Sequence, residues 1–338
     1  CRLYISVTLP GVSSCENSLF LRKMSMLSPI KFPDKLPGVV FFFCILIAQT
    51  SQSDIGDGPR AYLPPPIDTD VFSLYGMKVS GNSMIGSGRV TPNLNVDVDL
   101  VVAQYTRTME IRDRYISFTA VQPAGRLTSS LSLPNVAIAG TEASSEGLGD
   151  TQLLLTAGLY NLPLLTKETY RDYKPSFAVG GLARVTLPTG EYDQQQSANL
   201  GANRYSLQLV APITLGFGES FLDPRLTTID FLPSITLFGN NDDPSTGDTL
   251  SQEPLFKLET HVTHNLSSGF WLSLDSVYTF GGETETDGAA QNDTQRSFGL
   301  GGSLGLQFSK SLGLKATYGK TVDHNENGLD GEFIRLTL

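Results

Sequence analysis

The sequence has few cysteines, one tryptophan and no long apolar run. Its three cysteines, Cys1, Cys15 and Cys44, all precede residue 54. The rest of the chain has no thiol, which excludes disulfides, cysteine nucleophiles and cysteine–metal sites there. A membrane protein built from helices needs apolar runs of about 18 or more residues. The sequence contains no run of that length, so a bundle of transmembrane helices is excluded.

Positive charge is also scarce. The formal net charge is −10 at pH 7. Five of the 24 basic and two of the 34 acidic side chains lie in residues 1–53, which leaves 19 basic and 32 acidic ones and a net charge of −13 after that point. A surface this acidic repels a phosphate backbone, so no nucleic-acid partner is expected.

The front of the chain is typical of an exported protein. We interpret residues 1–23 as an upstream extension and residues 24–53 as a secretory signal peptide. Lys31 and Lys35 supply its basic start, and residues 38–48 (GVVFFFCILIA) supply its apolar core. A single membrane anchor is the alternative, although eleven apolar residues are few for a helical span.

Residues 269–280 (GFWLSLDSVYTF) alternate between apolar and polar side chains with the period of a β-strand. One face carries Phe270, Leu272, Leu274, Tyr278 and Phe280. The other face carries Ser273, Asp275 and Thr279, with Trp271 and Val277 among them. Aromatic residues at both ends of an apolar band are typical of a membrane-spanning strand. We therefore predict that the strand crosses a bilayer, with Trp271 and Phe270 at one interface and Tyr278 and Phe280 at the other.

The same pattern recurs along the chain after residue 68, and it predicts twelve strands. Their ranges are 69–80, 93–107, 114–131, 148–159, 176–187, 204–215, 227–238, 253–264, 269–280, 296–308, 312–321 and 332–338. Pro123 and Gly125 predict a bulge in the third strand. Residues 54–68 are rich in Gly and Pro and predict an extended lead-in on the periplasmic side. Residues 160–175 are compatible with either a short helix or a plug-like fold, and the sequence does not choose between them.

Connection lengths add an orientation to this pattern. The connections alternate between short and long, so all the long ones are expected to fall at one end of the strands. Lipid offers no hydrogen-bond partner, so a membrane-spanning sheet must close on itself. We predict an all-β fold over residues 69–338: a transmembrane antiparallel up-and-down β-barrel of about 12 strands in the cell outer membrane, with short periplasmic turns and long extracellular loops.

Polar side chains on the strands are then expected to face the lumen. Facing lipid at mid-depth, a basic group would cost about 2–4 kcal/mol. The lumen-lining candidates are Asp97, Asp99, Arg184, Asp230, Lys257, Glu259, His261, Asp275, Lys315 and Arg335. None of them forms a recognisable catalytic, metal or cofactor motif, so the sequence predicts no enzyme, no metal site and no cofactor.

Two hypotheses arise where Lys257, Glu259 and His261 meet the strand after them. The residues form either a charged constriction that selects solutes or an ordinary hydrated barrel wall. A register that pairs His261 with Ser273 would also permit a lipid hydrolase, although nothing marks a third orienting group or an oxyanion site.

Several segments in order resemble one family of outer-membrane barrels. They are GDGPRAYLPPP (56–66), EGLGDTQLLLTAGLY (146–160), GLARVTLPTGEYD (181–193), LGANRYSLQLVAPITLGFG (200–218) and SGFWLSLDSVYTFGGET (268–284). Together they are similar to the "MetA-pathway of phenol degradation" family over residues 54–338. The resemblance implies a transporter-like barrel that helps small, often aromatic, molecules across the outer membrane. It implies no set of catalytic residues.

The leading functional hypothesis is thus a porin-like channel for small molecules, including hydrophobic or aromatic ones. The alternative is a structural or adhesion barrel that works through its outer loops, and a lipid hydrolase is a third possibility. The expected partners are outer-membrane lipid and lipopolysaccharide, a small-molecule solute, and the barrel-assembly machinery. The last strand resembles the segment that this machinery recognises, although Leu338 replaces the usual final aromatic residue.

Overall fold

The computed structural model describes residues 57–338 except 84–88, 91–93, 132–141, 197 and 310–311. The predictions for residues 1–23 and 24–53 lie outside the described residues. Within the described ranges, no helix is both long and apolar enough to cross a membrane.

Seventeen strands and one short 3₁₀ helix make up the described part of the chain. The elements are β1 (Asp70–Gly81), β2 (Leu94–Ile111), β3 (Arg114–Leu131), β4 (Glu142–Leu148), β5 (Thr151–Tyr160), η1 (Thr169–Arg171), β6 (Phe177–Leu187), β7 (Ser206–Val210), β8 (Ile213–Phe217), β9 (Thr227–Phe238), β10 (Leu250–Gln252), β11 (Leu255–Ser267), β12 (Phe270–Gly281), β13 (Thr284–Thr286), β14 (Ala289–Ala290), β15 (Gln295–Ser309), β16 (Leu312–His324) and β17 (Gly331–Thr337).

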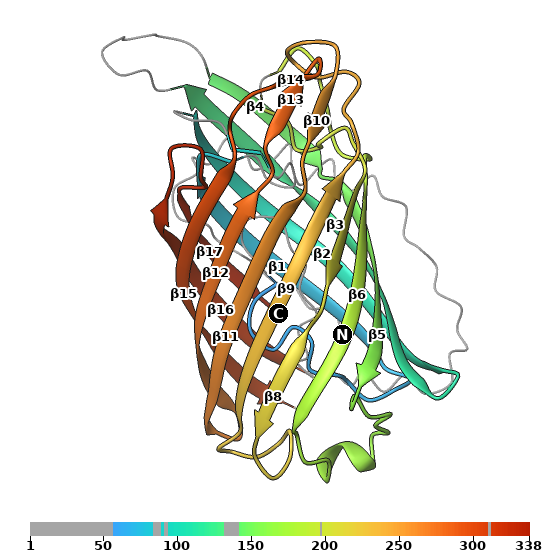
Figure 1. Cartoon of the computed structure of the whole chain (residues 1–338). Coiled ribbons are helices and arrows are strands. Elements are labelled where there is room, and N and C mark those ends of the chain that lie inside the picture. Colours follow the sequence, from blue (N-terminus) through green and yellow to red (C-terminus); the bar gives the residue numbers. More distant parts are fainter. Residues whose placement is uncertain (1–56, 84–88, 91–93, 132–141, 197, 310–311) are drawn as a thin grey trace, which may run out of the picture. The chain divides into compact units, whose positions relative to one another are not determined.

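The main sheet closes into a barrel (Figure 1). β1 pairs antiparallel with β2 on one side and with β17 on the other, from Tyr75↔Thr337 to Gly81↔Gly331. β4 and β5 together form one barrel strand, and so do β7 and β8. Over the described residues this gives twelve antiparallel barrel strands, which confirms the predicted fold. Closure satisfies the backbone donors and acceptors that lipid cannot satisfy.

Both interrupted strands have an identifiable cause. Between β7 and β8 lies Pro212, which has no N–H to donate, and its carbonyl accepts from the Gly180 N–H at 2.8 Å.

The β2–β3 register runs without a break through Pro123, so the bulge predicted in the third strand is wrong. The irregularity lies instead on the next strand, where β3 changes partner from β4 to β5 and the Gly149 N–H donates to the Pro123 carbonyl.

The two ends of the barrel differ. One end carries the tight turns 112–113 and 268–269, and the other carries the long loops and a small sheet of β10, β13 and β14 (Figure 1). The connection 160–175 also lies at the short-turn end and contains η1, so the prediction that all long connections fall at one end is wrong there. Following the usual asymmetry of bacterial barrels, we assign the short-turn end to the periplasm.

The outer face of the wall is apolar. Large apolar side chains at least one-third exposed occur on nearly every barrel strand, among them Phe72, Phe118, Leu155, Phe231, Leu258, Leu274, Leu300, Tyr318 and Ile334. Polar side chains alternate with them and are buried. This is the inverse of a water-soluble sheet and matches a wall surrounded by lipid.

Candidate functional site

The lead-in does not stay below the barrel, as the sequence predicted, but runs inside it. The Asp57 N–H donates to Glu259 Oε2 at 2.6 Å, and the Asp57 carboxylate accepts from Arg184 Nη2 at 2.8 Å. At the short-turn end the Ile67 N–H donates to the Leu165 carbonyl. Gly and Pro exclude this segment from the sheet, but its polar groups find partners on the inner wall.

Arg60 fixes the middle of the lead-in to the wall. Its guanidinium donates to Thr263 Oγ1 at 2.9 Å and to Asn265 Oδ1 at 2.7 Å. It also lies 4.6 Å from the ring centre of Trp271, a cation–π contact. Trp271 is therefore inside the barrel and 8% exposed. The prediction that it belongs to an interfacial aromatic belt is wrong, whereas Tyr278 and Phe280 do face outward.

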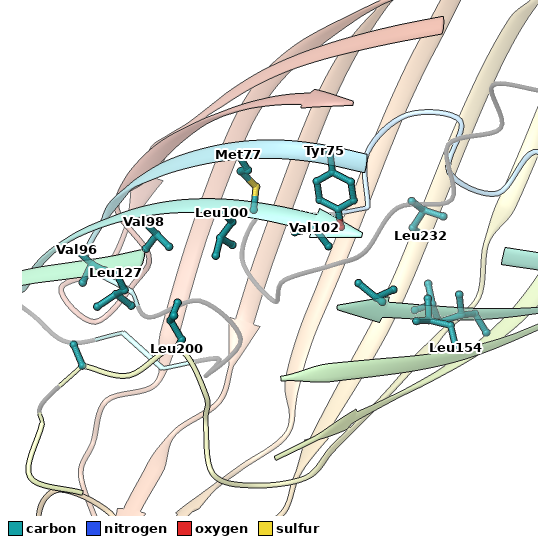
Figure 2. Close-up of a cluster of buried hydrophobic side chains, with 14 of the residues drawn as sticks. Tyr75, Met77, Val96, Val98, Leu100, Val102, Leu127, Leu154, Leu200 and Leu232 are labelled. Atoms are coloured by element: carbon teal, nitrogen blue, oxygen red, sulfur yellow. The ribbon is translucent and has the colours of Figure 1, made fainter. Parts of the chain in front are cut away.

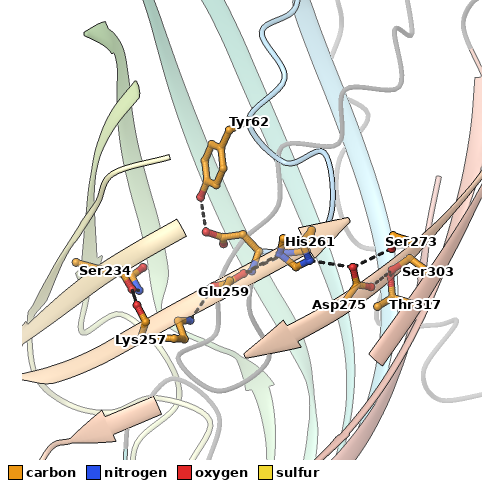
Figure 3. Close-up of polar contacts among 12 residues, drawn as sticks. Tyr62, Ser234, Lys257, Glu259, His261, Ser273, Asp275, Ser303 and Thr317 are labelled. Atoms are coloured by element: carbon orange, nitrogen blue, oxygen red, sulfur yellow. Dashed lines mark hydrogen bonds and ion pairs between the residues drawn. The ribbon is translucent and has the colours of Figure 1, made fainter. Parts of the chain in front are cut away.

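A chain of polar contacts crosses the inner wall from β11 to β16 (Figure 3). It starts with the Lys257–Glu259 ion pair at 3.3 Å and continues to His261, whose Nε2 lies 3.4 Å from Glu259. His261 Nδ1 lies 2.9 Å from Asp275. Ser303 then donates to Asp275 at 2.7 Å and contacts Thr317 at 2.9 Å. Each charge in this chain is buried and has an oppositely charged or hydrogen-bonding neighbour, which is what burial of charge requires.

The strand register argues against a hydrolase. His261 lies opposite Asp275 and Thr263 lies opposite Ser273, so the register that would pair His261 with Ser273 is wrong by two residues. The Ser273 hydroxyl donates to Asp275 Oδ1 at 2.8 Å instead of to His261. A nucleophilic serine needs its base within hydrogen-bond reach, and this one has a carboxylate there.

The other interior candidates lie near this chain. Arg184 on β6 is 2% exposed and donates to Gln208 as well as to Asp57. Asp230 on β9 accepts from Thr214 Oγ1 at 2.7 Å. Lys315 on β16 and Arg335 on β17 are buried in the same wall. The structure therefore places eight of the ten candidate residues inside the barrel.

Asp97 and Asp99 are the two exceptions, and their predicted inward orientation is wrong. Both are exposed on the outer face of β2, where Lys78 Nζ lies 3.4 Å from Asp99 and Ser80 donates to Asp97. The inward positions beside them belong to Val96, Val98 and Leu100. This end of β2 is next to the long loops, and its charged outer face indicates a position outside the hydrocarbon.

One side of the lumen is consequently apolar (Figure 2). Buried apolar residues of β1, β2, β3, β5, β6, β7 and β9 form one cluster with two loop residues. They are Tyr75, Met77, Leu94, Val96, Val98, Leu100, Val102, Val121, Leu127, Leu154, Leu182, Ala198, Leu200, Val210 and Leu232. We call this set the apolar cluster. Alternation revealed which residues share a face, but not that the apolar face turns inward here.

The loop 188–205 closes the apolar cluster from the long-loop end. Asp150, between β4 and β5, holds this loop by accepting from the N–H groups of Gly190 and Ala202, both at 2.8 Å. Burial lowers the pKa of Arg204 to about 10; its guanidinium lies 4.4 Å from the Phe238 ring centre.

Sequence reasoning missed the interior roles of Asp57, Arg60, Trp271 and Leu200. The strand pattern contained no signal for the two lead-in residues, because their partners lie about 200 positions away. Trp271 was detectable, since it alternates in step with Ser273 and Asp275. Among the described residues no group of three or more His, Cys, Asp or Glu side chains could hold a metal ion.

A known structure shares this fold. An outer membrane channel from Pseudomonas putida F1 superimposes with a TM-score of 0.67 at 19% identity, covering 83% of this chain and 97% of that one. The translocator domain of the autotransporter NalP from Neisseria meningitidis gives a TM-score of 0.37 at 12% identity, covering 79% and 86% of the two chains. No curated protein sequence matches the chain significantly.

The sequence itself matches one family model, the one described as "Putative MetA-pathway of phenol degradation", over residues 81–336. That range spans β2 to β17 and contains the polar chain and most of the apolar cluster. With its twelve-stranded barrel and this match, the chain belongs to the MetA-pathway of phenol degradation family.

Proposed function

We propose that the protein is a channel of the cell outer membrane that lets small apolar molecules, aromatic ones among them, reach the periplasm. The observation that carries this proposal is the apolar cluster on one side of the lumen. A channel for sugars or ions needs a hydrated wall, whereas this one offers aliphatic side chains from β1 to β9.

The energetics favour an apolar solute on this side. Removing apolar surface from water stabilises by about 25 cal/mol per Å². An aromatic group of roughly 150–250 Å² would therefore gain about 4–6 kcal/mol on full burial. Below the apolar cluster, a cavity of about 50 Å³ lies between the lead-in and the wall, lined by residues that include Leu63, Leu154 and Pro212. It extends the apolar surface toward the short-turn end.

The polar chain on the other side supports the same function in a different way. Lys257, Glu259, His261 and Asp275 bind one another, and the lead-in adds Asp57 to the network. Their hydrogen-bonding capacity is used within the protein, which favours a wall that holds the lead-in. Since Ser273 donates to Asp275 and not to His261, the proposal includes no catalysis.

Uptake by intact cells tests the proposal, because lipopolysaccharide is the barrier that a pure lipid vesicle lacks. Gram-negative cells that express the chain should accumulate ¹⁴C-labelled toluene several-fold faster than cells without it. Val98→Asp, which puts a carboxylate into the apolar cluster, should abolish the gain. Asp99→Val, a change of the same size on the outer face, should preserve it.

Equal uptake with and without the protein would refute the channel. If such cells instead gained only adhesion to surfaces through the outer loops, the structural barrel would be the better account.

A further inference from the structure

A row of donor side chains lies in the lumen wall where β16, β17 and β1 meet. Lys315 pairs with Thr337 across β16 and β17, and Thr337 pairs with Tyr75 across β17 and β1. Their side chains therefore form one inward row, because directly opposed residues in an antiparallel pair lie on the same face. Arg335 is the next inward residue of β17. All four side chains are at least 97% buried.

Lys315 lacks a counter-charge in the described part of the chain. Its side chain is fully buried, and its Nζ has no hydrogen-bond or ion-pair partner there. The Thr337 hydroxyl, beside it, also has no hydrogen-bond partner among the described residues. A buried ammonium without an acceptor is strongly unfavourable, so such a group indicates a missing ligand.

The carboxylates nearest to this row are already engaged. Asp57 binds Arg184 at 2.8 Å, and Asp275 lies 2.9 Å from His261 and accepts from Ser273 and Ser303. Further away, Glu259 pairs with Lys257. These carboxylates are therefore engaged, and none of them forms an ion pair with the Lys315 ammonium.

Space for a ligand adjoins this row. A cavity of about 70 Å³ is lined by Arg335 and Thr317, with Val79 and Phe333 on its wall. Thr317 is the next inward residue after Lys315 on β16, so the row borders this cavity. One water needs about 10–15 Å³ of such space, so the cavity has room for a small organic group.

From this arrangement we infer that Lys315, Arg335 and Thr337 form a binding site for the carboxylate of a small organic acid. The two cations attract the anion, and the threonine hydroxyl donates to an oxygen that the cations leave free. The two oxygens of a planar carboxylate can accept from the ammonium and the guanidinium at once. The inference rests on the proposed function, since the anion must enter the lumen, and it extends the range of solutes from apolar molecules to their carboxylated forms.

Ligand-observed NMR on the full-length protein in detergent micelles tests the site, with acetate as the probe. Wild-type protein should transfer saturation to the acetate methyl group, and acetamide, which has the same shape without the charge, should not compete. Lys315→Met should weaken acetate binding at least tenfold, and Thr337→Val should weaken it several-fold. Lys78→Met, an exposed lysine on β1 that does not line this cavity, is the matched control and should bind like wild type.

Heat-dependent migration on a gel will verify that each variant is folded. Because Lys315→Met removes an unpaired charge, the barrel should remain intact. Acetate binding that is unchanged in folded Lys315→Met, or equal competition by acetamide, would overturn the site. Displacement of acetate by a lower concentration of inorganic phosphate would overturn the choice of a carboxylate. Toluene uptake that persists in Lys315→Met would leave the channel proposal standing whatever the acetate result.

Discussion

Asp57 Oδ1 and Arg184 Nη2 lie 2.8 Å apart, and each side chain is only 2% exposed. The pair joins the lead-in to β6 across 127 positions of sequence. Since the second oxygen of Asp57 accepts from Tyr62 within the same segment, one carboxylate orders the lead-in and attaches it to the wall.

Asp57→Asn should therefore loosen the lead-in. Removing one partner of a buried ion pair leaves an uncompensated charge, here on Arg184, and costs about 3–5 kcal/mol. We expect lower stability in denaturant titrations and a larger single-channel conductance in planar bilayers. Arg184→Met combined with Asp57→Asn should recover much of the stability. Asp68→Asn, an exposed site in the same segment, is the control; equal effects of the two single Asp variants would contradict the prediction.

Gly305 leaves room for the indole of Trp271. A Cβ at residue 305 would lie 2.1 Å from Trp271 Cε2, so Gly305→Ala forces the ring to move. Overpacking of this kind costs about 1–3 kcal/mol. The single tryptophan should report the change as a shift in fluorescence. Gly299→Ala on the same strand, where the nearest atom is 3.5 Å away, should leave both stability and emission unchanged.

Trp271 should be shielded from lipid. In vesicles of brominated lipids, wild-type fluorescence is expected to be quenched weakly, because the indole lies inside the wall under Arg60. Exchanging the two neighbours in Phe270→Trp/Trp271→Phe moves the indole to the outward position. That variant should be quenched strongly. Strong quenching of the wild type would show that Trp271 faces the bilayer after all.

The turn between β8 and β9 should depend on pH. The N–H groups of Glu219 and Arg225 donate to the Asp223 carboxylate, both at 2.8 Å, and lower its pKa. A carboxyl with a lowered pKa stabilises the folded turn above its unfolded value of about 3.9, and that contribution is lost as pH falls through the folded value. Amide hydrogen exchange at Glu219 and Arg225, corrected for intrinsic rates, should accelerate below about pH 4. Asp223→Asn should remove the pH step, and constant protection from pH 2 to 6 would contradict the assignment.

Local periodicity predicted the fold because lipid imposes a strict rule on every strand. Residues 269–280 had to alternate, since one face meets lipid and the backbone must pair with its neighbours. The range predicted for the third strand, 114–131, equals that of β3, and the predicted range 227–238 equals that of β9. The strand interrupted at Pro212 was predicted as one segment, 204–215, because Pro212 removes one hydrogen bond without changing the alternation. The predicted strand 148–159 missed nearly all of β4.

Alternation was insufficient where the surroundings of a strand change along its length. Asp97 and Asp99 alternate with valines as regularly as any membrane strand, but there the outer neighbour is water. Period two assigns residues to faces and does not identify the inner face. The lead-in gave no periodic signal, because its position depends on contacts such as Asp57–Glu259 that only the closed barrel creates.

The long β2–β3 hairpin has a consequence for how a solute leaves water. Where β2 and β3 carry Asp99 and Arg126 on the outside, they carry Val98 and Leu127 on the inside. Charged side chains on the outer face indicate that this height lies beyond the hydrocarbon. In the proposed channel, a hydrophobic molecule arriving from outside would therefore lose its hydration shell above the bilayer. The dehydrated molecule would then move from one apolar surface to another without losing further hydration water.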